Sequence, residues 1–485
     1  MNFAQAALII WIISSVALFA FLRPVTAFTL TYVIGILVLP VEILEGGVFK
    51  GSIVFTQSLR IDKITACHIG AILGTLIFNF QLVRRFRPHW VDLAFLGICG
   101  GMFATSMSSG LGPKDGLSVA VECLRVNLPI IVLARIYVTT VGEVYEVMRI
   151  IVGAAVVYSV VCVLEFRFSP QLHRLTYGYF QHSFGQFARY SHYRPVGFLR
   201  HAIELSFFMG SSGAMAIWLW YKGLFKRPLW NMLPAWAAIG AILVGLLTTL
   251  TFSGYSAFLI AMGTFALFHF LRSRWLLWLL PAAAVVWMTG RYFNVFDASA
   301  LLSAAQQVDV TREQSLSYRL RSERNHLDAV AHHIVLGEGA QQHVLSEEGY
   351  GMAVDAWWMI QLSFYGLVGL GGWYLVWCAG IWAAFRRWKT LTPDLQTVAI
   401  AISVLLGIQF VDFLFNAFPS MFLLILDMGL LTAVRNYVPA GRPRMRGFPV
   451  QTMPAMPVVV LEPVAPFSTA GSLAGPIPRQ PGASV

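Results

Sequence analysis

The side chains best able to do chemistry are gathered in a polar segment, residues 291–355, between two long apolar runs. Residues 317–326 read Ser-Tyr-Arg-Leu-Arg-Ser-Glu-Arg-Asn-His, and Asp355 closes the segment where the next apolar run begins. Trp357 and Trp358 follow, and paired tryptophans are typical of a membrane interface. A carboxylate at that depth is costly unless it has a partner, so Asp355 is a candidate functional residue.

A second segment, 166–201, carries charge of one sign only. It has no Asp or Glu, and its basic residues are Arg167, Arg174, Arg189, Arg194, Arg200, His173, His182, His192 and His201. Guanidinium groups bind phosphate oxygens in pairs, so the segment predicts a phosphate-binding surface. The alternative is a loop that lies on anionic lipid headgroups and is anchored by its tyrosines.

An amphipathic helix is predicted near residues 315–334, after a short linker. Its apolar stripe consists of Leu316, Leu320, Leu327, Val330, Ala331 and Ile334. Arg319, Glu323 and His326 share a neighbouring face, and Arg321 lies on another. As a plain surface ion pair, Arg319 and Glu323 would contribute only roughly a few tenths of a kcal/mol. The Leu-Gly-Glu-Gly sequence at 336–339 predicts a sharp turn after the helix.

Apolar residues dominate the rest of the chain and position these two segments. Hydrophobic residues make up 57% of the sequence and charged residues 12%, with a mean hydropathy of +0.69. Soluble globular chains carry roughly 25% charged residues. The composition predicts an all-α polytopic transmembrane bundle of about 12–13 spans, and continuous runs of this kind exclude a barrel. The spans are expected near residues 5–22, 26–41, 66–83, 91–108, 117–135, 148–164, 202–221, 232–252, 255–271, 275–290, 357–385, 396–415 and 418–434.

Short basic clusters between the spans predict the orientation of the chain. The five clusters are Arg84/Arg85/Arg87, Lys222/Lys226/Arg227, Arg272/Arg274, Arg386/Arg387/Lys389 and Arg442/Arg444/Arg446. All five fall on one side, which the positive-inside rule makes cytoplasmic. Segments 166–201 and 291–355 then lie on the opposite side. The net charge of +11 is explained by orientation, so no nucleic-acid partner is expected. The five cysteines lie in or beside apolar runs and are expected to be core residues.

Six parts are expected along the chain. They are the N-terminal transmembrane helices (1–165), a basic external loop (166–201), central transmembrane helices (202–290), a large external loop with amphipathic helices (291–356), C-terminal transmembrane helices (357–437) and a disordered, proline-rich cytoplasmic tail (438–485).

Three groups of residues, in this order, resemble the O-antigen polymerase/ligase family. Residues 194–197 (Arg-Pro-Val-Gly) are similar to the family's R-x-x-G segment before a span. Residues 251–256 (Thr-Phe-Ser-Gly-Tyr-Ser) stand where the family has a serine-rich break between spans. Ser317 and Arg319, then the glycines at 337 and 339, Asp355, and Tyr-Gly-Leu-Val-Gly at 365–369 follow its large-loop pattern. The resemblance covers roughly residues 190–385.

Two departures from the family pattern bear on the activity. No arginine follows the serines at 253–256, where many relatives have one. Asp355 stands where ligases carry a histidine, which favours a polymerase of repeat units.

The resemblance implies a multi-pass protein of the bacterial inner membrane. Relatives transfer an oligosaccharide from polyprenyl pyrophosphate to a sugar hydroxyl at the outer leaflet, in exopolysaccharide or O-antigen synthesis. The expected partners are that lipid-linked oligosaccharide, membrane lipids, and a chain-length regulator and a flippase as candidate protein partners. Two alternatives remain open. One is an O-antigen ligase that transfers glycan to lipid A-core, and the other is a flippase or transporter, hinted at by Glu122, Arg125, Asp412 and Asp427 within the spans.

Under this resemblance, Asp355 is the expected base for the acceptor hydroxyl, with His326 and His343 as further candidates. Arg319 is expected to stabilise charge that develops on the leaving pyrophosphate. Arg194, Arg200 and Arg321 are the expected pyrophosphate ligands. Asp355 could instead be the structural partner of a loop arginine. The sequence has no tight metal-ligand cluster, so metal-independent chemistry without a cofactor is expected.

Overall fold

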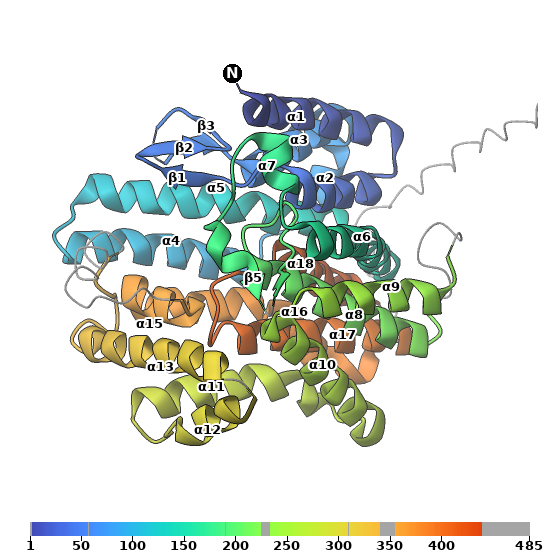
Figure 1. The fold of residues 1–485 in the computed structure, drawn as a ribbon. Coiled ribbons are helices and arrows are strands. Elements are labelled where there is room, and N and C mark those ends of the chain that lie inside the picture. The colour runs from blue at the N-terminus through green and yellow to red at the C-terminus, as the bar shows by residue number, and fades with distance from the viewer. Residues whose placement is uncertain are drawn as a thin grey trace, which may run out of the picture. The chain divides into compact units, whose positions relative to one another are not determined.

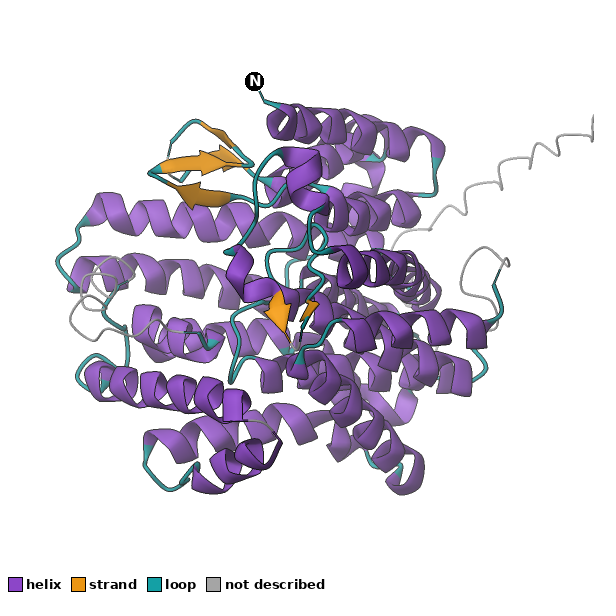
Figure 2. Ribbon diagram, viewed as in Figure 1, coloured by secondary structure: helices purple, strands orange, loops and turns teal. Residues whose placement is uncertain are grey.

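The computed structural model describes residues 2–56, 58–189, 191–224, 233–308, 310–339 and 355–438. Within these ranges the chain is mostly helical, and its strands form three two-stranded antiparallel sheets (Figures 1 and 2). The all-α fold class is confirmed. The expectations for His343 and for nearly all of the tail at 438–485 fall outside the described residues.

Every apolar run expected from the sequence is helical. The helices are α1 (Phe3–Phe21), α2 (Pro24–Val38), α3 (Lys63–Phe78), α4 (Trp90–Ser108), α5 (Pro113–Tyr137), α6 (Val141–Phe168), α8 (Ala202–Tyr221), α9 (Ala235–Thr248), α10 (Phe252–Leu271), α11 (Leu279–Tyr292), α15 (Trp357–Trp377), α16 (Ala379–Arg387), α17 (Pro393–Asp412) and α18 (Met421–Asn436). Short 3-10 turns at Phe80–Arg85, Phe184–Phe187, Arg274–Trp278 and Trp388–Thr390 accompany them.

Eight described helices are long and apolar enough to cross a membrane: α1, α4, α5, α6, α8, α10, α15 and α17. Three more, α2, α3 and α9, are apolar but shorter. Local sequence sets the helix ends. Thr140 caps α6, because its side chain accepts from the backbone N–H of Glu143 while the Glu143 side chain bonds back to the cap. Thr392 caps α17 in the same position, and Pro393 occupies the first turn.

The segment before α3 forms two small hairpins that the sequence did not predict. Strands β1 (Ile43–Glu45) and β2 (Val48–Lys50) pair with each other, as do β3 (Ile53–Val54) and β4 (Arg60–Ile61). The hairpin charges meet the charges that interrupt α5: Arg60 Nη2 lies 2.7 Å from Glu122 Oε1, and Arg125 Nη1 lies 3.2 Å from Asp62 Oδ2. Burial raises the pKa of Asp62, but the Arg125 guanidinium and bonds from Thr65 outweigh it and lower that pKa overall.

Basic residues gather at one end of the helices. Arg135 of α5 donates to the Arg87 carbonyl (2.5 Å), and Arg387 of α16 donates to the Val434 carbonyl (2.7 Å). The Arg274 guanidinium lies 4.8 Å from the centre of the Phe385 ring, which joins the end of α10 to the end of α16. Asn436 Nδ2 at the end of α18 donates to the Thr139 carbonyl (3.4 Å), just after α5, so the clusters after α3, α10 and α16 share one end of the bundle, as the predicted orientation requires.

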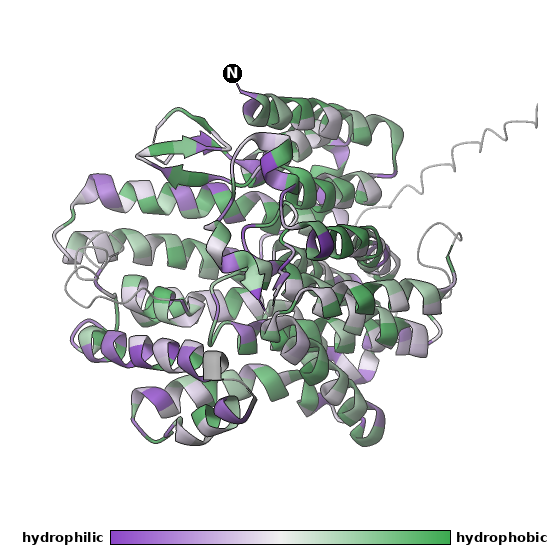
Figure 3. Cartoon of the chain, in the orientation of Figure 1, coloured by the Kyte–Doolittle hydropathy of each residue, from purple (hydrophilic) through white to green (hydrophobic). Residues whose placement is uncertain are grey.

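The polar segment after α11 forms two helices, α12 (Ser299–Val308) and α13 (Val310–Val330). The predicted short linker is present at residues 293–298, but the prediction missed α12 and the early start of α13. Hydrophilic residues colour much of α13 (Figure 3), yet the helix buries Leu320, Leu327 and Val330. The structure also changes the expected partner of Glu323, which is buried: its Oε1 lies 2.5 Å from Nε of Arg291, a largely buried side chain at the end of α11.

Segment 166–201 contains α7 (Leu172–Tyr177) and the short strands β5 (Ala188–Arg189) and β6 (His192–Tyr193), which pair with each other. It packs on the protein through buried side chains, among them His173, Phe187, Arg194 and Val196. The segment is thus a folded part of the protein.

Candidate functional site

Helix α15 is broken at Gly366, which has φ 62° and ψ −160°. Only glycine adopts this conformation without strain, because it has no Cβ. The segment after α13 satisfies the backbone groups that the break releases: Glu338 N donates to the Ser363 carbonyl (2.9 Å), and Leu367 N donates to the Ile334 carbonyl (2.8 Å). The two glycine motifs, at 336–339 and 365–369, therefore dock directly on each other.

The Arg-Pro-Val-Gly turn at 194–197 is held by Glu165 at the end of α6. The Glu165 carboxylate accepts from the N–H groups of Val196 (2.8 Å) and Gly197 (2.7 Å). Arg194 is buried, with 5% of its surface exposed, and donates from Nε (3.2 Å) and Nη2 (3.0 Å) to the Thr251 hydroxyl. The arginine motif is thereby joined to the turn between α9 and α10.

The same turn leads into a chain of polar contacts, which we call the polar cluster: Ser253, Asp412, Asn416, Arg319 and Asp355. Ser253 Oγ and Asn416 Nδ2 both donate to Asp412 Oδ1, at 2.6 Å each. Asn416 Oδ1 accepts from Arg319 Nη1 (3.2 Å). Arg319 Nε lies 3.6 Å from Asp355 Oδ2. The cluster joins α10, α17 and α13 to the residues that precede α15.

The exposed end of the polar cluster is the ion pair. The Asp355 side chain is 48% exposed and that of Arg319 is 26% exposed, whereas Asp412 is buried. A small cleft beside the pair is lined by both of these residues and by Met359 and Phe415. A carboxylate and a guanidinium are therefore accessible side by side, and Asp412 supports the guanidinium from behind through Asn416.

His201, which caps α8, is a buried imidazole beside the polar cluster. Its Nδ1 accepts from Ile203 N (3.1 Å), and its ring stacks on Phe418. Burial, then the positive charge of Arg194, lowers the pKa of His201 to about 3, and Arg319 acts in the same direction. Burial opposes a charge of either sign, whereas the charges of Arg194 and Arg319 oppose only a further positive charge and would favour an anionic group.

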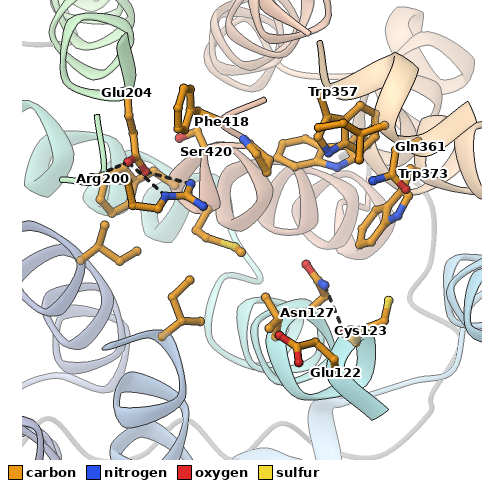
Figure 4. A pocket seen from close by; sticks show the side chains of 18 of the residues that line it. Glu122, Cys123, Asn127, Arg200, Glu204, Trp357, Gln361, Trp373, Phe418 and Ser420 are labelled. Atoms are coloured by element: carbon orange, nitrogen blue, oxygen red, sulfur yellow. Dashed lines mark hydrogen bonds and ion pairs between the residues drawn. The ribbon is translucent and has the colours of Figure 1, made fainter. Parts of the chain in front are cut away.

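A cavity of about 410 Å³ lies among α5, α8, α15 and residues 418–422. Figure 4 shows Arg200 and Glu204 on one side of it, Trp357, Gln361 and Trp373 on another, and Asn127 projecting from α5. Arg200 donates to Glu204 from Nε (3.2 Å) and Nη2 (3.1 Å). Among the predicted pyrophosphate ligands, Arg200 therefore lies in the cavity and is already bonded to a carboxylate.

The structure brings together only some of the residues predicted from the sequence. Arg319 and Asp355 are in contact, and Arg194 reaches them through the turn at 251–253. His326 is 1% exposed, and its Nδ1 bonds with the Ser322 carbonyl (2.7 Å). Arg321 is exposed on α13 and donates to Ser317 Oγ (3.4 Å). Neither of these two residues lines the cavity or the cleft beside Arg319.

Asp412 and Asn416 are the residues that sequence analysis missed as parts of the site. An aspartate and an asparagine four positions apart at the end of an apolar run can face the same way, and this was the available signal. Within the described ranges, no three His, Cys, Asp or Glu side chains are placed to hold a metal ion. Neither a comparison with models of known protein families nor one with curated proteins gives a significant match.

Proposed function

We propose that this chain is a multi-pass protein of the bacterial inner membrane that polymerises polyprenyl-pyrophosphate-linked oligosaccharide repeat units of a surface polysaccharide. One observation carries the proposal: motif residues far apart in sequence converge on the polar cluster. Arg194 bonds to Thr251, Ser253 bonds to Asp412, and Arg319 meets Asp355. Glycosyl transfer from a pyrophosphate needs a base for the acceptor and cations for the leaving group, and both lie here.

Two features support the membrane assignment. Eight described helices are apolar and long enough to cross a membrane, and the basic residues and the polar cluster lie at opposite ends of several of them. Helices α8, α10 and α17 each have one end at the polar cluster or its neighbour His201, and the other end near basic residues. If the basic end faces the cytoplasm, the cluster lies toward the outer leaflet. That is the leaflet at which the lipid-linked repeat units are polymerised in the family that the sequence resembles.

In the proposed mechanism, Asp355 accepts the proton of the acceptor sugar's hydroxyl group. The hydroxyl oxygen attacks the anomeric carbon of the donor's first sugar, and the bond from that carbon to the pyrophosphate oxygen breaks. The pyrophosphate leaves with the bonding electrons, the accessible Arg319 guanidinium stabilises its charge directly, and the buried Arg194 adds positive charge from behind the site. Asp412 and Asn416 orient Arg319, because the Asn416 amide bonds to Asp412 through its nitrogen and to Arg319 through its oxygen.

The test is deletion of the gene in its native host, followed by sizing of the surface glycan. The proposal expects loss of long chains with single repeat units retained. Long chains left on the lipid carrier would instead identify a ligase, and units trapped inside the cell would identify a flippase. Complementation with Asp355→Asn should fail to restore long chains. The matched control is Asp328→Asn, because Asp328 is exposed on the surface of α13 and pairs only with Arg324 among the described residues.

A flippase is the second candidate, favoured by one observation. The break of α15 at Gly366 resembles the interrupted helices that line transport sites. The buried acids have structural partners, however: Asp427 accepts from Gly380 N (2.9 Å), and Asp412 is bonded within the polar cluster. The enzyme is therefore the better supported of the two.

A further inference from the structure

We propose that the cavity of about 410 Å³ binds a neutral sugar residue of the substrate's glycan, and that the polyprenyl chain and the pyrophosphate lie elsewhere. The inference rests on the proposed function in taking a glycan as the substrate. The volume of the cavity lies within the range of roughly 300–1,000 Å³ that is typical of small-molecule pockets. Three features of the cavity select among the parts of a lipid-linked saccharide: its charge, its polar groups and its aromatic walls.

The charge of the cavity opposes a pyrophosphate. Its charged lining residues are two cations and two anions: Lys63, Arg200, Glu122 and Glu204. Arg200 is bonded twice to Glu204, and Lys63 donates to the carbonyls of Ile36 and Phe198, at 3.2 Å each. A pyrophosphate would meet two carboxylates without gaining an uncommitted cation, so its desolvation would go uncompensated.

The polar groups of the cavity oppose a hydrocarbon chain. Gln361 is 9% exposed, and its Oε1 has no hydrogen-bond partner among the described residues. Rotation about its last side-chain bond can present either the carbonyl or the amino group to the cavity. An apolar ligand would leave this buried amide unsatisfied, which is unfavourable. The Asn127 amide and the partly exposed Glu122 carboxylate lie on α5 across the cavity (Figure 4).

The aromatic walls suit a sugar ring. Trp357, Trp373 and Tyr365 line the cavity on the α15 side. The C–H groups of a pyranose ring carry small positive charges, which pack favourably on the electron-rich face of an aromatic ring. Sugar hydroxyls both donate and accept, so they can satisfy the Gln361 amide and add bonds to Asn127 and Glu122, which Cys123 and Arg60 already hold in place. A lipid-linked saccharide consists of a polyprenyl chain, a pyrophosphate and sugars. Only a sugar can both bond to the polar groups of the cavity and pack on its aromatic rings.

The cavity shares its boundary with the polar cluster. Trp357 N donates to the Asn416 carbonyl (3.0 Å), and Phe418, which lines the cavity, stacks on His201. A sugar in the cavity would thus lie next to the residues proposed to transfer it. The cavity would therefore help to select which glycan is transferred.

The test is calorimetric titration of the purified full-length protein with the host's repeat-unit oligosaccharide, freed of its lipid by mild acid. Saturable binding is expected, and Gln361→Met, which keeps the side-chain volume, should weaken it by about tenfold, as expected for one or two lost neutral hydrogen bonds. Asn127→Leu should also weaken binding, and it serves as the test variant if Gln361→Met does not fold. The matched control is Gln306→Met on the exposed surface of α12, which should bind normally.

Two outcomes would overturn the proposal. One is equal binding of the oligosaccharide to the wild type and to every folded cavity variant. The other is no oligosaccharide binding to the folded wild type, and binding of farnesyl pyrophosphate that the cavity variants weaken would then assign the cavity to the lipid pyrophosphate. Failure of the proposed function is distinguishable: oligosaccharide binding with normal chain lengths in the deletion strain would refute the polymerase and keep the sugar cavity. Loss of long chains in the deletion strain without oligosaccharide binding to the protein would keep the polymerase and refute the sugar cavity.

Discussion

At the scale of single residues, Arg194 owes its position to two nitrogens of one guanidinium that converge on the Thr251 hydroxyl. A lysine keeps the charge but cannot make both bonds, because its ammonium is a single point on a flexible stem. Under the proposed function, Arg194→Lys should lower the yield of polymer by about tenfold, the effect of roughly 1.4 kcal/mol. The measurement is glycan yield in the complemented deletion strain.

The control for Arg194→Lys is Arg167→Lys, because Arg167 is exposed at the end of α6 and lies over the Phe168 ring. It should leave the polymer unchanged. Normal polymer from Arg194→Lys would refute a role for the guanidinium geometry at this position.

His173 gives the stability of the protein a pH dependence. It is fully buried; its Nε2 accepts from Val41 N (3.1 Å), and its Nδ1 donates to the Tyr179 carbonyl (2.9 Å). Burial lowers the pKa of His173 to about 4, below the value of about 6.5 in an unfolded chain. The unfolded state therefore binds more protons between these values, and the stabilisation, of order 3 kcal/mol, is present above about pH 6.5 and lost as the pH falls toward 4.

The corresponding experiment is thermal unfolding of the purified protein from about pH 7 to about pH 4.5. The His173→Gln variant should be less stable at neutral pH and lose less stability on acidification than the wild type. His332→Gln is the control, since His332 is exposed, and it should follow the wild type. An acid sensitivity that His173→Gln leaves unchanged would exclude His173 as its source.

At the scale of elements, the break in α15 depends on one glycine. A Cβ on Gly366 would lie 2.3 Å from the Val335 carbonyl oxygen and 2.6 Å from Leu336 N, both backbone atoms that cannot move aside easily. Gly366→Ala should therefore push the 336–339 segment off α15 and destabilise the protein by several kcal/mol, about 1–3 of them from the positive φ alone. The measurement is the unfolding midpoint in denaturant.

Gly371 in the same helix is a close match for comparison, because a Cβ there meets nothing within 4 Å. Gly371→Ala should be neutral or stabilise the protein by up to about 1 kcal/mol, since alanine is the better helix former. Equal effects of the two substitutions would show that the docking of the glycine motifs does not depend on Gly366.

The elements also show how far the sequence predicts this molecule. Continuous apolar runs predicted the helices well, because in such a run length and composition decide the element. Helical spacing predicted ion pairs less well, although the alternative in which Asp355 partners a loop arginine agrees with the structure. Arg319 and Glu323 share a face of α13, yet Glu323 pairs with Arg291 and Arg319 pairs with Asp355. An exposed pair on one helix contributes little, so a partner from another element can replace it, and spacing along one helix does not reveal that partner.

The candidate site likewise contains residues that the sequence could predict and residues that it could not. Asp355 and Arg319 could be predicted because charges beside an apolar run are conspicuous in the sequence. The role of Asp412 could not, because it depends on the approach of α10 and α13 to the end of α17. The cavity was missed for a related reason: Gln361 and Trp373 look like ordinary members of an apolar helix until α5 and α8 are placed opposite them.

At the scale of the whole molecule, the gathering of basic residues at one end predicts an orientation that labelling can test. Ser315 of α13 and Thr390, just after α16, are both exposed and belong to opposite ends of the helices in this assignment. All five native cysteines are buried, so they should give little background with a membrane-impermeant maleimide. Single substitutions Ser315→Cys and Thr390→Cys are therefore clean reporters of the two ends.

In intact spheroplasts, Ser315→Cys should react with the maleimide at once, whereas Thr390→Cys should react only after the membrane is opened. The physical reason is the retention of Arg386, Arg387 and Lys389 on the cytoplasmic side. The reverse pattern would place the polar cluster in the cytoplasm and exclude polymerisation at the outer leaflet. Equal labelling of both residues in sealed spheroplasts would contradict a membrane-spanning arrangement of α15 to α17, whatever the chemistry of the site.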